Sequence, residues 1–194
     1  MLLSRSFYLR SDVVAISREL LGKYLCTCFD GEITSGMICE TEAYAGIVDR
    51  ASHAFGGRRT PRTEIMYRQG GAAYVYFCYG IHSLFNVVTN QQDIPHAILI
   101  RGIIPADGIE TMLCRTGKKA ITRDSGNGPG KVSKLLGIHY SHTGTDLTLN
   151  GVSPAIWIED RNVRVDPVTI LTGPRIGVDY AGEDALLPYR FRIP

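Results

Sequence analysis

The sequence predicts a single compact domain of the α+β class, with a largely antiparallel sheet and flanking helices. At 194 residues the chain has the length of one domain, and it contains no internal repeat, low-complexity tract or linker. Strand-like runs follow one another in pairs with a tight turn between them, which is the pattern of antiparallel hairpins. Short helical patterns lie before and after these pairs. We therefore expect residues 1–194 to fold as one domain.

The first helix is predicted directly after Ser11-Asp12, because both residues can cap a helix N-terminus. Val13, Ile16 and Leu20 follow at helical spacing, and Gly22 stands where a helix would end. This pattern predicts an amphipathic helix with a structural role.

Two hairpins are predicted next. Residues 23–29 and 34–43 read as strands on either side of an Asp30-Gly31 turn. The aromatic-rich run 72–80 reads as a strand, and residues 84–89 read as the strand that returns from it.

Residues 97–104 predict a buried strand that is interrupted by Arg101. An arginine in such a run needs an anionic partner or a cleft. A short helix is expected over 107–113, and Gly128-Pro129 opens another helix through Leu136, whose start could offer free N–H groups and a lysine to a phosphate. The remaining chain predicts short strands that contain Trp157, Ile170 and Ile176 and are broken at Asn150-Gly151, Gly173-Pro174 and Pro188.

The stretch 37–44 (Met-Ile-Cys-Glu-Thr-Glu-Ala-Tyr) carries the strongest hint of chemistry. Side chains alternate along a strand, so Glu40, Glu42 and Tyr44 would share one face. Two neighbouring carboxylates repel each other, which raises the pKa of at least one of them. A raised carboxylate beside an aromatic ring suits a general base that acts on a flat, unsaturated substrate. The alternative is an edge strand with a solvated acidic face.

Charge is distributed unevenly along the chain. Residues 50–134 carry a net charge of +7, while residues 1–49 and 135–194 carry −3 and −2. A basic middle between acidic ends indicates a one-sided positive surface, which is what a phosphate backbone requires. The alternative is a set of scattered, solvated charges.

Single residues near the two hairpins can be read in two ways. Tyr74 and Tyr76 would share one strand face, and Tyr79 falls near a hairpin tip, where it could act as a wedge between base pairs or pack on a loop. His53 lies in an arginine-rich loop, where a lone histidine is usually structural. A metal site combining His53 with a carboxylate has no supporting ligand spacing.

Composition excludes several classes of protein. The apolar runs are shorter than the roughly 18 residues that a membrane span needs, and the N-terminus lacks the pattern of a secretory signal. The five cysteines are odd in number and show no paired metal spacing, so we expect reduced thiols in a cytoplasmic protein.

Taken together, these segments resemble the alkyladenine (3-methyladenine) DNA glycosylase family. The matching segments follow the family's order from about residue 6 to the end. They are Glu40-Thr41-Glu42-Ala43-Tyr44, Ala51-Ser52-His53-Ala54, Arg59-Thr60-Pro61-Arg62, Tyr74-Val75-Tyr76 with Tyr79-Gly80, Phe85-Asn86, Leu99-Ile100-Arg101, Gly128-Pro129-Gly130-Lys131 and Pro174-Arg175-Ile176-Gly177. The resemblance implies a mixed, largely antiparallel curved sheet with a protruding β-hairpin and flanking helices, similar to the C-terminal domain of formyltransferases.

The resemblance also implies roles for single residues. Glu42 would be the general base that activates the water attacking the sugar C1′. Tyr44, His53 and Tyr76 would line the pocket and stack on the flipped base.

Further residues are implied around that pocket. Asn86 would sit on its floor and hinder the exocyclic amino group of normal guanine, and Leu99 would contact the substrate. Arg101 would lie behind the pocket near the backbone of the flipped nucleotide, and Tyr79 would be the wedge. Phosphate contacts are implied for Arg58, Arg62 and Lys131.

The activity implied is that of a DNA glycosylase in base excision repair, which flips out alkylated or deaminated purines and hydrolyses their N-glycosidic bond. No lysine stands in the 37–44 stretch to form a Schiff base, so we expect a monofunctional enzyme that leaves an abasic site. Its partner would be double-stranded DNA containing damaged purines. We expect no cofactor, no metal and no membrane association, and a monomer that is cytoplasmic, or nucleoid-associated in a bacterium.

Three other functions are alternatives. A non-catalytic nucleic-acid-binding domain of the same fold would need basic residues but no carboxylate above an aromatic slot. A metal-dependent nuclease would use Glu40, Glu42 and His53. The helix-hairpin-helix glycosylases would require a glycine-rich hairpin or a four-cysteine cluster, and the sequence has neither.

Overall fold

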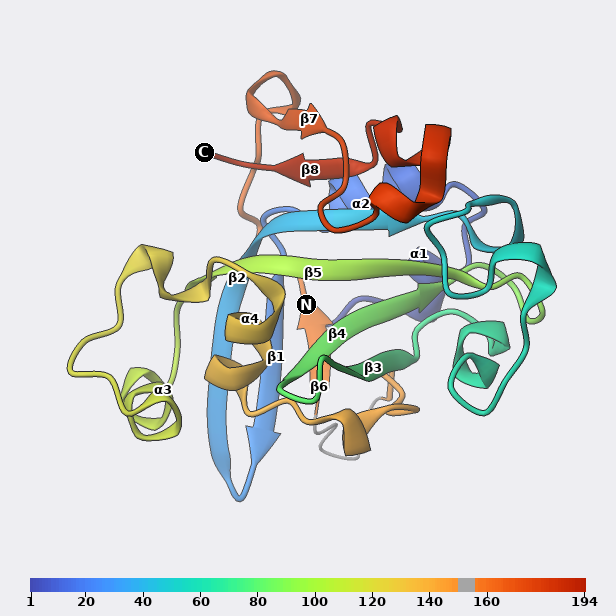
Figure 1. Cartoon of the computed structure of the whole chain (residues 1–194). Coiled ribbons are helices and arrows are strands. Elements are labelled where there is room, and N and C mark those ends of the chain that lie inside the picture. Colours follow the sequence, from blue (N-terminus) through green and yellow to red (C-terminus); the bar gives the residue numbers. More distant parts are fainter. Residues whose placement is uncertain (150–155) are drawn as a thin grey trace.

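One curved sheet forms the centre of the molecule in the computed structural model, which describes residues 1–149 and 156–194 (Figure 1). Within these residues all seven strand pairings are antiparallel, and the main strand order is β3-β4-β5-β2-β1-β6. The predicted α+β class, with a curved and largely antiparallel sheet, is confirmed. The turn expected at Asn150-Gly151 lies outside the described residues.

The elements of the described residues have the following bounds. The strands are β1 (Tyr24–Phe29), β2 (Glu32–Tyr44), β3 (Ala73–Cys78), β4 (His82–Thr89), β5 (His96–Pro105), β6 (Ile156–Glu159), β7 (Leu171–Gly173) and β8 (Arg190–Arg192). The α-helices are α1 (Arg5–Tyr8), α2 (Val13–Glu19), α3 (Ile109–Thr116) and α4 (Pro129–Leu136). Short 3-10 helices are η1 (Gly46–Val48), η2 (Phe55–Gly57), η3 (Glu64–Tyr67), η4 (Arg123–Gly126), η5 (Tyr140–His142), η6 (Pro167–Thr169) and η7 (Asp179–Leu186).

The sheet forks along β2. The first half of β2 pairs with β1 up to Met37, and its second half pairs with β8 at residues 40–42. The other edge of β2 pairs with β5 from Gly36 to Tyr44, and the register of this pairing shifts on both sides of Glu40. Figure 1 shows β8, β2 and β5 side by side beyond the fork. The acidic end of β2 therefore lies inside the sheet and not at its edge.

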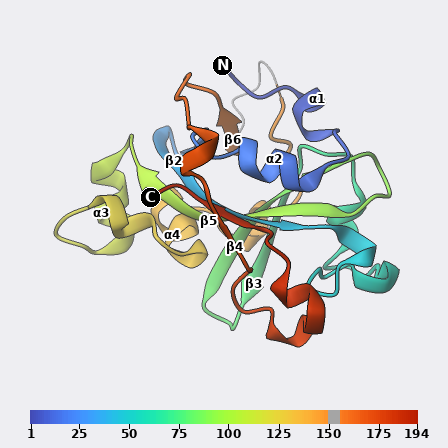
Figure 2. The same cartoon turned by 90° about the horizontal axis from the view of Figure 1, so that it is seen from above.

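Helix α2 holds one face of this strand. Asp12 caps the helix by accepting a hydrogen bond from the Ala15 N–H (2.9 Å), as its position before the apolar pattern predicts. Ser17 donates to the Thr41 hydroxyl (3.0 Å), and that hydroxyl donates to the Ser17 carbonyl (2.9 Å). Because side chains alternate along β2, this contact leaves Glu40 and Glu42 on the opposite face. Figure 2 shows α2 and α4 on opposite sides of the sheet.

Helix α4 begins beside β5. The Gly128 N–H donates to the Arg101 carbonyl (3.0 Å), so the start of α4 is tied to the strand that carries Arg101. Just before it, η4 lies so close to β5 that a Cβ on Gly126 would be 2.2 Å from the Ile103 carbonyl oxygen. Only glycine allows this approach.

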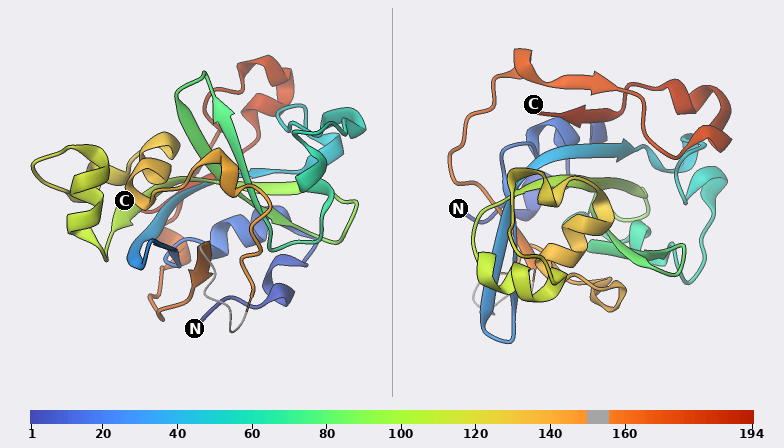
Figure 3. Two further views of the ribbon diagram at one scale, coloured as in Figure 1. Left: turned by 90° about the horizontal axis from the view of Figure 1, so that it is seen from below. Right: turned by 60° about the vertical axis from the view of Figure 1, so that its left-hand side comes forward.

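The β3–β4 hairpin projects from the sheet, as Figure 3 shows in its left-hand view. Tyr79 stands at the tip with a φ of 51° and 93% of its surface exposed. A left-handed conformation is strained for a tyrosine. Because Tyr79 is almost fully exposed, packing in the core does not offset that strain.

The structure corrects some of the predicted elements. Ile176 lies in a loop and not in a strand, because its N–H donates to the Glu42 side chain instead of to a neighbouring strand. The helix expected over 107–113 begins at Ile109, since Asp107 accepts from the Ser35 hydroxyl and pairs with Arg161. Helix α1 and strand β8 are too short to give a periodic pattern, and the sequence did not predict them.

No helix formed by residues 1–149 or 156–194 is long and apolar enough to cross a membrane.

Replacing Gly126 with alanine is expected to destabilise the fold by about 1–3 kcal/mol, because the added methyl group would force η4 away from β5. Urea unfolding followed by circular dichroism measures this change. Gly173→Ala is the matched control, because a Cβ there meets no atom within 4 Å, and its effect should stay within about 0.5 kcal/mol. Equal stability of the two variants would contradict the close packing of η4.

Candidate active site

A cavity of about 430 Å³ lies between the β3–β4 hairpin, the end of β2, β5 and the segment after β7. This volume is in the range of small-molecule sites. Eight of the residues predicted for the site line it, from segments up to 57 positions apart in the sequence. They are Tyr44, His53, Arg62, Tyr76, Tyr79, Asn86, Leu99 and Arg101.

Three predicted residues do not line this cavity. Arg58 and Lys131 are exposed outside it, although Pro129 at the start of α4 is part of the lining. Glu42 is fully buried, and its carboxylate lies directly behind the lining residues that hydrogen-bond or pair with it. Glu42 is therefore separated from the cavity by the residues that hydrogen-bond or pair with its carboxylate.

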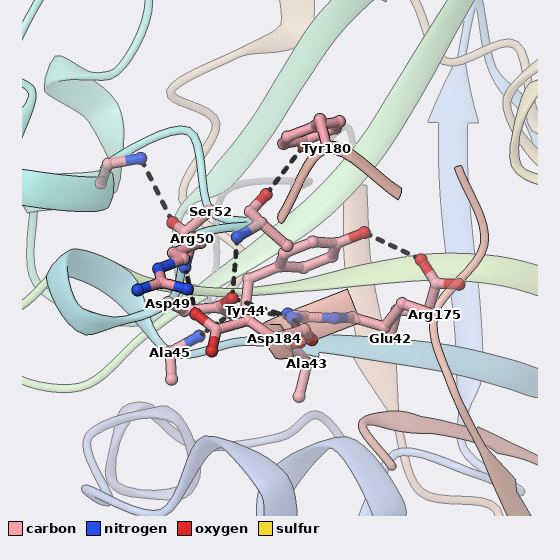
Figure 4. A network of polar contacts seen from close by, with 12 residues as sticks. Glu42, Ala43, Tyr44, Ala45, Asp49, Arg50, Ser52, Arg175, Tyr180 and Asp184 are labelled. Carbon is pink, nitrogen blue, oxygen red and sulfur yellow. Dashed lines mark hydrogen bonds and ion pairs between the residues drawn. The ribbon is translucent and has the colours of Figure 1, made fainter. Parts of the chain in front are cut away.

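The Glu42 carboxylate is held by groups from three parts of the chain. Its Oε2 accepts a hydrogen bond from the Tyr44 hydroxyl (2.9 Å), which Figure 4 shows, and its Oε1 accepts from the Ile176 N–H (2.8 Å). Arg101 Nε lies 3.5 Å from the same Oε1. A buried carboxylate needs such partners, because burial without them would favour its neutral form.

The pKa of Glu42 lies above its usual range, and burial is the main cause. Arg101, the Ile176 N–H and the Tyr44 hydroxyl all lower this pKa, while the charge of Glu40 raises it least of all the contributions. The predicted direction is therefore right and Glu40 contributes to it, but the main cause is burial, which the strand pattern does not predict. Repulsion from Glu40 is weak because arginines stand between and around the two carboxylates.

Arg101 has the anionic partners that its buried strand requires. Its Nε lies 3.3 Å from Glu40 Oε1 and 3.5 Å from Glu42 Oε1. Arg190 on β8 also approaches Glu40, at 3.6 Å. Glu40 and Glu42 reach the same guanidinium, so they lie on one face of β2 as strand alternation predicts.

Three aromatic rings cluster on one wall of the cavity. His53 and Tyr76 touch edge to face with ring centroids 4.7 Å apart, and Tyr74 lies 5.4 Å from Tyr76. His53 Nδ1 shares a hydrogen bond with the Tyr74 hydroxyl (2.8 Å), and Arg62 Cζ lies 4.9 Å from the centre of the Tyr76 ring. Because His53 and Tyr76 touch, a flat ligand has no room between these two rings.

His53 is neutral at physiological pH. Burial, and after it the charges of Arg62 and Arg58, lower the pKa of His53 to about 4. The aromatic wall therefore carries no positive charge of its own, although a guanidinium stands beside it.

The amide of Asn86 has a fixed orientation. Its Nδ2 donates to the Tyr74 carbonyl (3.1 Å) and to the Leu84 carbonyl (3.2 Å). Both amide hydrogens are therefore used within the protein. The carbonyl oxygen is the polar atom of Asn86 that remains to meet a ligand in the cavity.

A buried ion pair between Arg175 and Asp49 lies beside the site, and the sequence did not predict it. Arg175 and Asp49 are almost fully enclosed, and Arg175 Nη2 donates to Asp49 Oδ1 (2.8 Å). Figure 4 shows the pair beneath Tyr44. Arg175 belongs to one of the segments that carry the family resemblance, but nothing in the sequence identifies its partner 126 positions away.

Residues 1–149 and 156–194 contain no group of three His, Cys, Asp or Glu side chains arranged to hold a metal ion. In that part of the chain Glu40, Glu42 and His53 thus do not form the cluster that a metal-dependent nuclease would use.

Comparison with known proteins identifies the class of this chain. A family model described as methylpurine-DNA glycosylase (MPG) matches residues 6–194. A Chlamydia felis protein named "Putative 3-methyladenine DNA glycosylase" is 46% identical over 99% of this chain and 96% of its own length. Proteins of the same name from Desulfitobacterium hafniense and Bacillus thuringiensis are 40% and 41% identical, over 98% and 96% of this chain and 94% and 92% of their own lengths.

The chain is therefore a DNA glycosylase, a hydrolase that acts on N-glycosyl bonds. It belongs to the methylpurine-DNA glycosylase family. This result decides between the predicted enzyme and the alternative of a non-catalytic binding domain in favour of the enzyme.

His53 is expected to titrate near pH 4 when its ring signals are followed by NMR, and Arg62→Ala should raise its pKa because a neighbouring positive charge is removed. The folded pKa lies below the value of about 6.5 for an unfolded histidine, so this residue's contribution to stability is lost as pH falls from about 6.5 through about 4. Arg68→Ala, another exposed arginine, should leave the titration unchanged. A His53 signal that titrates near pH 6.5 in the unaltered protein would refute this description.

Proposed function

We propose that this DNA glycosylase acts as a monomer on double-stranded DNA, flips an alkylated or deaminated purine into the cavity, and hydrolyses its N-glycosidic bond with a water activated by Glu42. The product would be an abasic site in an uncut strand. The observation that carries this proposal is the position of the Glu42 carboxylate, buried directly behind a cavity with an aromatic wall and a cationic rim.

Glu42 is suited to the role of general base. Its pKa is raised towards working pH, which makes the carboxylate more basic, while Arg101 and two hydrogen-bond donors keep the ionised form accessible. The attacking water would lie between Arg101 and Ile176, which flank Oε1 and also line the cavity. Glu42 must be ionised to accept a proton, so the rate should rise with pH through its raised pKa.

The base would lie between Tyr44 on one side and the touching rings of His53 and Tyr76 on the other. Stacking on aromatic side chains contributes on the order of 1–3 kcal/mol per base. An N-alkylated purine is cationic, so the aromatic faces add a cation–π attraction of roughly 0.5–2 kcal/mol that normal bases lack. A neutral His53 avoids the charge repulsion that a protonated imidazole would exert on such a base.

Asn86 and Leu99 would form the floor of the cavity and select the base by its shape. They are directly paired across β4 and β5, and both are buried. Both amide hydrogens of Asn86 are committed to carbonyls, so its fixed oxygen would face the base and would hinder the exocyclic amino group of normal guanine.

Flipping the base out of the duplex costs a few kcal/mol. Tyr79, exposed at the tip of the hairpin, would fill the gap left in the stack. Arg58, Arg62 and Lys131 are exposed around the cavity and would bind the neighbouring phosphates.

No lysine occurs among the described residues that line the cavity. A Schiff base with the sugar would need an amine at that place. We therefore infer a monofunctional reaction that does not cut the strand.

Glu42→Gln should reduce the single-turnover release of methylpurine from methylated duplex DNA by about 10²–10⁴-fold, because an amide cannot accept the proton of the water. The assay is run with a chelator present. Glu40→Gln is the matched control, since it changes a carboxylate that also pairs with Arg101, and it should lose far less activity. Equal release by Glu42→Gln and the unaltered protein would move the role of general base elsewhere, with Glu40 as the next candidate.

Tyr79→Ala should slow excision from duplex DNA by about tenfold or more, which is the loss expected when a stacking ring is removed. Excision from single-stranded DNA should change little, because no gap has to be filled there. Val168→Ala is the control, since Val168 is 90% exposed and is not among the residues that line the cavity. A loss of the same size on both kinds of DNA would contradict the wedge role.

A further inference from the structure

The ion pair between Asp49 and Arg175 joins four segments of the chain. Arg175 donates to both carboxylate oxygens of Asp49, to the Ala43 carbonyl on β2 (2.9 Å) and to the Asp184 carbonyl in η7 (3.0 Å). Asp49 also accepts from the backbone N–H groups of Ala45 (2.9 Å) and Ala51 (3.0 Å). Figure 4 shows these contacts converging beneath the Tyr44 ring.

Both hydrogen-bond donors of Glu42 are next to Arg175. The Arg175 guanidinium carbon lies 4.8 Å from the centre of the Tyr44 ring, whose hydroxyl donates to Glu42 Oε2. Ile176, which follows Arg175 in the chain, donates its N–H to Glu42 Oε1. A movement of Arg175 would therefore displace both donors together.

Fold stability does not account for this pair. Burying two charges costs several kcal/mol per ion, and apolar residues of the same volume often stabilise a fold equally well. Arg175 Nε also has no hydrogen-bond partner within the described residues, which is a further cost. An apolar side chain, however, could not make the directed hydrogen bonds of the planar guanidinium group.

We propose that Asp49 and Arg175 are positioning residues for the glycosylase reaction, which hold the Tyr44 ring and the Ile176 N–H against the Glu42 carboxylate. This inference rests on the proposed role of Glu42. The pair touches neither the cavity nor the base, and it acts only through the two donors.

The proposal has a consequence for the pH dependence of the rate. The Tyr44 hydroxyl and the Ile176 N–H both lower the pKa of Glu42, so loosening them moves the rising limb of the rate–pH profile to higher pH. The charged and titratable groups around Glu42 are Glu40 and Tyr44 on β2, Arg101 on β5, Arg190 on β8, which approaches Glu40, and Arg175 itself. A useful variant keeps all these charges.

Arg175→Lys meets this requirement, because lysine keeps the positive charge and loses the planar fork. We expect its single-turnover excision rate to fall by about 10²-fold, the loss typical of a small misplacement of catalytic groups. The rising limb should move to higher pH, while binding to a duplex that contains an abasic-site analogue stays unchanged.

Asp49→Asn provides a second route if Arg175→Lys does not fold, since asparagine has nearly the same shape. Its rate should fall in the same way. Asp146→Asn is the matched control, because Asp146 also pairs with an arginine, Arg5, and accepts a backbone N–H two residues further on. This control should lower the unfolding temperature without changing the excision rate of the folded enzyme or its pH profile.

The proposal is overturned if folded Arg175→Lys or Asp49→Asn excises at the parental rate with the parental pH profile. It is equally overturned if either variant loses only thermal stability, as Asp146→Asn should. Glu42→Gln, assayed in parallel, separates a failure of the proposed function from a failure of the positioning role. An active Glu42→Gln refutes the proposed function, whereas an inactive Glu42→Gln with parental Arg175→Lys and Asp49→Asn refutes the positioning role alone.

Discussion

The burial of the Glu42 charge is the constraint on which the rest of the site depends. A carboxylate removed from water is driven towards its neutral form unless charged groups and hydrogen-bond donors replace the lost hydration. Here Arg101, the Tyr44 hydroxyl and the Ile176 N–H do so, and each comes from a different part of the chain. The carboxylate is thus kept basic by burial and kept ionisable by its partners.

The fork of the sheet explains how these partners come together. Strand β2 changes its neighbour from β1 to β8 at Glu40, so its last residues enter the middle of the sheet with β5 on one side and β8 on the other. That position brings Arg101 and Arg190 to the acidic face, while Ser17 and Thr41 fix the opposite face to α2. A carboxylate at a sheet edge would instead be hydrated, with a pKa close to its ordinary value.

Local patterns in the sequence predicted the parts of this arrangement that depend on local forces. The capped helix after Asp12, the two hairpins and the common face of Glu40 and Glu42 follow from spacing and turn residues alone. The pairing of Asp49 with Arg175 and the Ile176 N–H bond depend on residues more than 120 positions apart, and no local pattern encodes them. For the same reason the sequence could show that two carboxylates are close together, but not that burial outweighs their repulsion.

The aromatic wall of the cavity is neutral, whereas the arginine beside it is positively charged. The phenols of Tyr74 and Tyr76 have pKa values raised by burial, and His53 has a lowered one, so all three rings stay neutral around pH 7. The guanidinium carbon of Arg62 lies 4.9 Å from the centre of the Tyr76 ring, so a positive charge of the rim stands directly beside the neutral wall. A positive charge in this place repels a cationic group in the cavity and attracts a phosphate outside it.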